Sequence, residues 1–84
     1  MILQLYYGDN CPACDEMEPY FDKVEVKEYV VKEKYNVKDL NPLTLSRLKL
    51  RTKPTIILIW DDDKEVDRCY NIEWLNKLIY SLAL

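Results

Sequence analysis

Two cysteines separated by two residues are the part of this sequence with the clearest chemistry. The segment Cys11-Pro12-Ala13-Cys14 follows an apolar stretch over residues 2–7 and precedes a helical pattern. With Cys11 at the helix N-cap and Pro12 at the first helical position, both sulfur atoms fall on the first turn, close enough to form a disulfide. Unpaired N–H groups and the helix dipole favour a thiolate on Cys11, so we expect its pKa to lie below the usual value of about 8.5.

This arrangement predicts thiol–disulfide exchange, in which a thiolate is the attacking species. Cys11, at the end of the helix, is the expected nucleophile. Cys14 lies one turn deeper, so we expect it to be less exposed and to act as the resolving thiol. It would attack the mixed disulfide on Cys11 and release the substrate.

Two other classes of function remain open for the same cysteines. A C-x-x-C segment can supply half of a metal site, but closed structural zinc sites need four ligands. The chain has no histidine and one further cysteine, Cys69, so a metal or iron–sulfur module would need carboxylates or a second chain. The other alternative is a non-catalytic binding domain, in which Cys11→Ser would leave partner affinity intact.

Composition narrows the class of protein. Eighty-four residues predict one domain over residues 1–84, and 49% apolar with 32% charged residues excludes intrinsic disorder. The net charge of -3 and a pI of about 4.9 argue against nucleic-acid binding. No apolar run approaches the roughly 20 residues of a membrane helix. The first residues show no signal-peptide pattern, so we expect a reducing, cytoplasmic location and no membrane partner.

Apolar periodicity and capping residues predict the element order β-α-β-α-β-β-α and hence an α/β fold. Strands separated by helices indicate a parallel pair, and the last two strands indicate an antiparallel hairpin. We therefore expect a mixed four-stranded sheet with helices on both faces. Pro19 lies inside the first helix and is expected to kink or end it. The expected elements are a strand over 2–7, a helix from Pro12, a strand around 30–38, a short helix after Asn41-Pro42, strands over 55–60 and 65–70, and a last helix capped by Asn71 with Ile72, Leu75, Leu78, Ile79 and Leu82 on one face.

The chain resembles the thioredoxin/glutaredoxin superfamily over nearly its whole length. The resemblance rests on a strand leading into the cysteine pair and on further segments in the same order as in that superfamily. These are Pro19 in the first helix, Asp39-Leu40-Asn41-Pro42 before the second, Lys53-Pro54-Thr55 opening an apolar strand, and Val66-Asp67-Arg68 before the last helix. It implies a minimal thioredoxin-like fold of glutaredoxin size and a thiol–disulfide oxidoreductase acting as an electron carrier in redox homeostasis.

The resemblance also implies which residues contact the substrate. An X–Pro bond is cis in only about 5–6% of cases in folded proteins, so the residues alone favour a trans Pro54. The superfamily instead has a cis proline against the cysteine pair, with the preceding residue pairing with the substrate chain. By that likeness the substrate groove would be lined by Pro12, Ala13, Lys53, Pro54 and Thr55.

Departures from the superfamily patterns bear on the reductant. The C-P-Y-C of common glutaredoxins is C-P-A-C here, and their Gly-Gly before the last helix is replaced by residues 68–71. Leu5 stands where thioredoxins bury an aspartate that serves the second cysteine. Deprotonation of Cys14 would therefore rely on water or on a nearby carboxylate such as Glu16 or Glu18. The missing Gly-Gly and the D-x-N-P segment favour a thioredoxin reductase drawing on NADPH; a glutathione-dependent glutaredoxin is the alternative.

The remaining expectations concern partners and two single residues. The resemblance implies no tightly bound cofactor or metal, a monomer, and disulfide-bearing client proteins, with ribonucleotide reductase as one example. If Lys53 lies beside the cysteines, its charge lowers the pKa of Cys11, against Asp9 and the acidic first helical turn; the alternative is a solvated lysine. Cys69 is expected to pack as a small buried hydrophobe, with a reactive thiol as the alternative.

Overall fold

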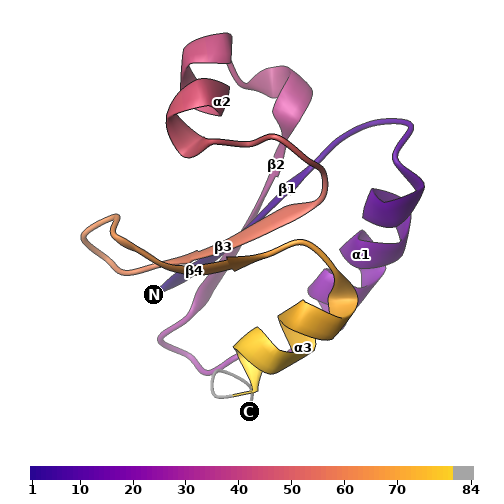
Figure 1. Ribbon diagram of the computed structural model, residues 1–84. Coiled ribbons are helices and arrows are strands. Elements are labelled where there is room, and N and C mark those ends of the chain that lie inside the picture. The colour runs from indigo at the N-terminus through magenta and orange to yellow at the C-terminus, as the bar shows by residue number, and fades with distance from the viewer. Residues whose placement is uncertain (81–84) are drawn as a thin grey trace.

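The computed structural model describes residues 1–80 and has an α/β architecture in three layers (Figure 1). A sheet forms the middle layer, α1 and α3 cover one face, and α2 lies over the other. The predicted fold class is therefore confirmed. In chain order the elements are β1 (Ile2–Tyr7), α1 (Pro12–Lys23), β2 (Val31–Asn36), a 3₁₀ turn η1 (Val37–Asp39), α2 (Pro42–Leu48), β3 (Thr55–Ile59), β4 (Glu65–Cys69) and α3 (Ile72–Ile79).

The sheet is mixed, with the strand order β2-β1-β3-β4. β1 pairs in parallel with β2 and antiparallel with β3, and β4 pairs antiparallel with β3 at the edge. A right-handed helical crossover is the usual connection between parallel neighbours, and α1 supplies the connection here. This topology places the end of β1 beside the start of β3, with Tyr6 opposite Thr55.

The core occupies both faces of the sheet because side chains along a strand alternate between them. Leu5 of β1 and Ile56 of β3 belong to the larger cluster, which also contains Phe21 of α1 and Leu75 of α3. Ile57 belongs to the smaller cluster toward α2. All five residues of β3 are buried, as expected for a central strand that is apolar on both faces.

Two of the predicted helix caps have the expected geometry. The Asn41 side chain accepts a hydrogen bond from the Thr44 backbone N–H at 2.8 Å, and Asn71 does the same for Trp74 at 2.8 Å. Such caps satisfy one of the otherwise unpaired N–H groups at a helix start. In the described part of the chain, no helix has the length and apolar character needed to cross a bilayer.

Several element boundaries differ from the sequence expectations. α1 does not end at Pro19 but continues to Lys23, because a proline removes only one intrahelical N–H and this site is exposed to water. β2 stops at Asn36, whose side chain accepts from the Lys38 N–H and begins η1. α2, whose end the sequence left open, stops at Leu48 because Lys49 adopts a left-handed φ of 57°. β4 ends one residue early, and Leu82 lies outside the described residues.

Hydrogen bonds from Arg68 connect the end of α2 to the edge strand β4. The guanidinium of Arg68 donates to the Glu65 carboxylate through Nε at 2.7 Å and Nη2 at 2.6 Å. The same Nη2 donates to the carbonyl of Leu48 at the end of α2, at 3.1 Å. These charged hydrogen bonds lower the pKa of Glu65 and hold the α2–β3 connection against β4.

Cys69 lies in the larger core cluster and is 3% exposed. Burial raises the pKa of its thiol from 9.0 to about 12, with the negative charge of Asp67 acting in the same direction. The side chain therefore packs as an un-ionised apolar group, as expected from its type.

We expect Cys69 to resist alkylation in the native protein and to make stability fall at alkaline pH. Because the pKa of the thiol is raised in the folded state, its contribution to the free energy of unfolding is complete below about pH 9. That contribution is lost as the pH rises toward 12. Iodoacetamide labelling followed by mass spectrometry, and urea denaturation against pH, test this. Cys69→Ala is the control: it should lack the part of the alkaline loss of unfolding free energy that Cys69 causes. Equal labelling of Cys69 in native and denatured protein would contradict its burial.

Candidate functional site

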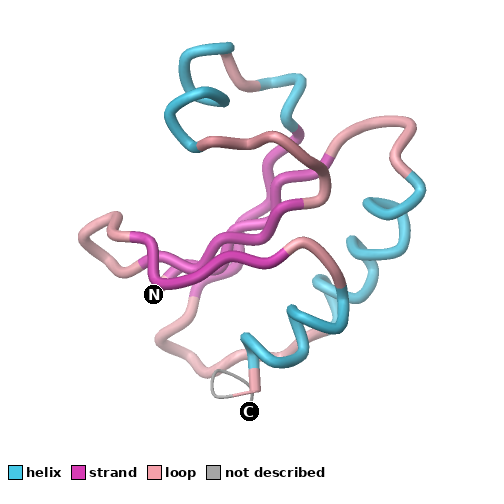
Figure 2. The backbone as a smooth tube through the Cα atoms, in the orientation of Figure 1, coloured by secondary structure: helices cyan, strands magenta, loops and turns pink. Residues whose placement is uncertain are grey.

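Three loops meet at one end of the sheet and form the candidate site. They connect β1 to α1, α2 to β3 and β4 to α3, and they are the pink segments that gather beside the start of α1 in Figure 2. The two central strands, β1 and β3, end and begin at this place, so the loops leave from the best-supported part of the sheet. Functional residues are often presented by loops on a rigid scaffold in this way.

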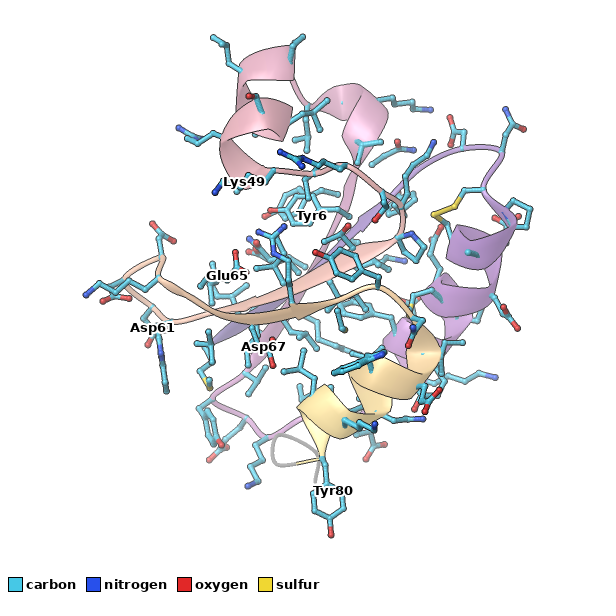
Figure 3. The ribbon with its side chains drawn as sticks, viewed as in Figure 1. Tyr6, Lys49, Asp61, Glu65, Asp67 and Tyr80 are labelled. Carbon is cyan, nitrogen blue, oxygen red and sulfur yellow. A yellow bond between two sulfur atoms is a disulfide. The ribbon has the colours of Figure 1, made fainter. Side chains whose placement is uncertain are left out.

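The first loop carries the two cysteines, which form a disulfide visible beside the start of α1 (Figure 3). Their Cα atoms are 5.1 Å apart. Cys11 is the N-cap, and its Sγ accepts a hydrogen bond from the Cys14 backbone N–H at 3.1 Å. Cys14 is fully buried, whereas Cys11 retains 7% exposure. The sulfur of Cys11 is thus the more accessible one, and it receives an N–H donor that also stabilises a thiolate there.

The second loop brings Lys53 and Pro54 against the disulfide. The Lys53–Pro54 peptide bond is cis. The Lys53 carbonyl oxygen lies 3.7 Å from the Sγ of Cys11. Pro54 is buried, while the side chain of Lys53 is exposed. Thr55 has no exposed surface, and its hydroxyl donates to the Thr52 carbonyl at 2.8 Å, so its side chain braces the loop from inside.

A groove of about 510 Å³ lies next to the cysteine loop, and three of the five residues expected to contact substrate line it. Ala13, Lys53 and Pro54, all predicted to contact substrate, line it. Pro12 is exposed nearby but does not line this groove. The remaining lining residues, which the sequence did not single out, are Lys49, Arg51, Thr52 and Tyr70. The sequence did contain a signal for Lys49 and Arg51: they alternate with Lys53 at every second position in a segment without acidic residues.

The side chain of Lys53 passes directly over Gly8. A β-carbon added to Gly8 would lie 2.5 Å from the Cδ of Lys53 and 2.7 Å from its Nζ. Gly8 has no positive φ, so its backbone does not call for glycine, and an added β-carbon would displace the flexible end of the Lys53 side chain. The glycine therefore leaves room for the Lys53 side chain to cross this loop, which its position at the end of a strand did not reveal.

Asp9, which would oppose a thiolate on Cys11, is already paired. Its carboxylate accepts from Lys38 Nζ at 3.0 Å and from the Asn36 amide at 3.1 Å. Both hydrogen bonds lower the pKa of Asp9. Among the described residues, no carboxylate forms an ion pair with Lys53, although Lys53 contributes weakly to the same lowering. The positive charge of Lys53 is thus left without a partner next to the disulfide.

β1 offers Cys14 no carboxylate, because its sequence has no acidic residue. Leu5, which stands where thioredoxins bury an aspartate, is fully buried in the larger core cluster. Glu18 lies 3.6 Å from Lys34 and is engaged in that ion pair, while Glu16 is exposed. Within residues 1–80, no group of three or more acidic, histidine or cysteine side chains is arranged to hold a metal ion.

Comparison with solved structures identifies the fold. Thioredoxin f2 of Chlamydomonas reinhardtii has a TM-score of 0.79 at 22% identity, over 95% of this chain and 76% of that one. Thioredoxin 1 of Thermosipho africanus has a TM-score of 0.75 at 23% identity, over 96% and 92%. Plasmodium falciparum thioredoxin has a TM-score of 0.75 at 18% identity, over 99% and 71%. The chain has a thioredoxin fold.

No protein-family model matches the sequence, and no curated protein matches it. The likeness to thioredoxins therefore extends to the fold, and the chemistry of the site has to be argued from its own residues. Within the thioredoxin fold of this chain, those residues are a disulfide at the start of a helix, a cis proline facing it and an unpaired lysine beside it.

We expect Lys53→Met to raise the pKa of Cys11 in the reduced protein by about 0.5–1 unit, because a nearby cation stabilises the thiolate. The ultraviolet absorbance of the thiolate, titrated against pH, measures this. Lys64→Met is the matched control, since Lys64 lies in the β3–β4 hairpin and is highly exposed. An unchanged titration in Lys53→Met would show that Lys53 is a solvated lysine without influence on Cys11.

Proposed function

We propose that this protein is a thiol–disulfide oxidoreductase that reduces disulfides in client proteins. The observation that carries the proposal is the asymmetry of the cysteine pair. Cys11 at the helix N-cap retains 7% exposure and accepts a hydrogen bond from the Cys14 N–H, whereas Cys14 has no exposed surface. A nucleophile that a client can reach and a second thiol that only the first can reach are what a two-step exchange requires.

The proposed reaction begins with the reduced pair. The thiolate of Cys11 attacks one sulfur of the client disulfide, and the other client sulfur leaves as a thiolate. Cys14 then loses its proton and attacks the Sγ of Cys11, forming the Cys11–Cys14 disulfide and expelling the second client sulfur. Two electrons pass to the client, and the two protons from the pair balance the two client thiols.

Client binding would use the surface next to the disulfide. We assign Pro12 and Ala13 to contacts around the cysteines, and Lys53 and Pro54 to contacts with the backbone of the client. The Lys53 carbonyl, 3.7 Å from the Sγ of Cys11, is close enough to position a chain joined to that sulfur. Thr55 would serve through its backbone or by bracing the loop, since its side chain is buried.

The pair must be reset by an external reductant, for which we propose a thioredoxin reductase supplied by NADPH. Residues 68–71 stand in the sequence where glutaredoxins carry the Gly-Gly that lies near glutathione. Three of these four residues stabilise the fold instead. Arg68 anchors α2, Cys69 packs in the core and Asn71 caps α3. Glutathione is the alternative reductant, and disulfide-bearing enzymes such as ribonucleotide reductase are among the proposed clients of a monomeric, cytoplasmic carrier.

We expect Cys11→Ser to abolish reduction of a disulfide substrate, with a loss of at least about 1,000-fold, because no nucleophile replaces the thiolate. Cys14→Ser should still attack but should accumulate as a mixed disulfide, detectable by mass spectrometry. Cys69→Ala is the control and should retain activity. If Cys11→Ser and the unchanged protein reduced insulin disulfides equally well, the proposal would fail.

The reduction potential of the pair distinguishes the two reductants. Thioredoxin lies near −270 mV, and glutaredoxins lie at roughly −200 to −230 mV. We expect a value near or below about −250 mV, measured by equilibration with a glutathione redox buffer. A value near about −200 mV or above would mean that glutathione can reset the pair, and the assignment to thioredoxin reductase would be wrong.

A further inference from the structure

The charges of this chain are unevenly distributed. None of the fifteen acidic residues lies between positions 40 and 60, whereas four of the twelve basic residues do. The segment that connects α2 to β3 is therefore strongly cationic in a protein whose net charge is -3. A local charge opposite to that of the whole chain indicates a surface that meets a partner of complementary charge. The four basic residues are Arg47, Lys49, Arg51 and Lys53.

Three of these cations share one groove with Ala13, the neighbour of Cys14 in the chain. Lys49, Arg51 and Lys53 line the groove that also contains Ala13 and the cis proline, and no acidic residue lines it. Figure 3 shows Lys49 at the end of α2, on the side of the sheet away from α3. A client chain joined to Cys11 would leave the disulfide past these side chains.

This groove adjoins another, in which the additional basic residue is already paired. A second groove, of about 520 Å³, is lined by Lys49, Arg51 and Tyr70 again and is extended by Arg68. Glu65 also lines it, but Arg68 binds this carboxylate through two hydrogen bonds of 2.6 and 2.7 Å. The two grooves share three residues and together reach from Ala13 to the edge strand β4, which suits an extended polypeptide better than a tripeptide.

The three cations are available for such a partner. Within residues 1–80, the side chains of Lys49, Arg51 and Lys53 form no ion pair or hydrogen bond. Lys34 and Lys38, by contrast, are paired with carboxylates. Unpaired cations beside a reactive sulfur attract carboxylates and raise association rates with acidic partners.

We propose that this basic groove binds an acidic segment of the client polypeptide next to the disulfide that Cys11 attacks. The inference rests on the proposed oxidoreductase function and adds the class of client to it. Carboxylates of the client contact Lys49, Arg51 and Lys53 while its disulfide sulfur meets the Sγ of Cys11. The protein thereby selects disulfides flanked by aspartate or glutamate.

Two synthetic peptides with the same intrachain disulfide test this inference. One carries glutamates beside a cysteine, and the other carries glutamines at the same positions. The reduced protein, freed of excess reductant, is mixed with each peptide, and peptide reduction is followed by rapid quenching and chromatography. We expect the acidic peptide to react about tenfold faster at low ionic strength. The ratio should approach one in about 1 M salt, where charge interactions are screened within about 3 Å.

Matched variants locate the effect. In Lys49→Gln/Arg51→Gln the ratio of acidic to neutral rates should fall close to one, and Arg51→Gln alone should lower it partly. Lys64→Gln removes one positive charge in the hairpin, as Arg51→Gln does in the groove, and should keep the full ratio. Circular dichroism confirms that each variant is folded.

The outcomes separate the inference from the proposed function. If both peptides are reduced at equal rates, or if the double variant keeps the ratio, the groove does not select acidic clients although the oxidoreductase function stands. If glutathione disulfide reacts much faster than either peptide and its rate depends on Lys49 and Arg51, the groove is a site for that tripeptide and the inference is overturned. If no disulfide is reduced, the proposed function itself is wrong.

Discussion

The hydrogen bond from the Cys14 backbone N–H to the Cys11 sulfur is the interaction on which the candidate site depends. It exists because the first turn of a helix has N–H groups without intrahelical acceptors, and Cys11 occupies the position that accepts one of them. At this position Cys11 retains 7% exposure, whereas Cys14, one helical turn further on, has none. A dithiol at another point of a helix would have neither the donor nor the difference in exposure.

The rest of the fold keeps that helix start in place. β1 lies between β2 and β3, and its residues Leu3 and Leu5 are fully buried under α1 and α3. The loop that follows β1 therefore has a rigid base, and the antiparallel β3 begins beside it, which brings Pro54 to the disulfide. Arg68 secures the other side by binding both Glu65 and the end of α2.

Electrostatics around the disulfide follow from which charges are paired. Asp9 would disfavour a thiolate on Cys11, but Lys38 and Asn36 satisfy its carboxylate. Lys53 has no such partner among the described residues, and Gly8 leaves room for its side chain to cross the loop. Lys53 therefore brings a positive charge to the loop that faces the disulfide, and the basic groove extends this positive charge over the surface that a client would cover.

Local patterns in the sequence determined the element order, the caps at Asn41 and Asn71, the central position of β3 and the cysteine pair at a helix start, because each depends on neighbouring residues. They left the end of α1 open, because Pro19 could kink or end it; the helix continues to Lys23, since one lost hydrogen bond does not outweigh the packing of a helix whose later residue Phe21 is buried. Only the tertiary structure decided that Lys53 crosses Gly8, that Lys38 pairs with Asp9, and that Lys49, Arg51 and Tyr70 share a groove with Ala13. These contacts join residues far apart in the chain, and their geometry depends on strand order and loop paths that no local pattern encodes.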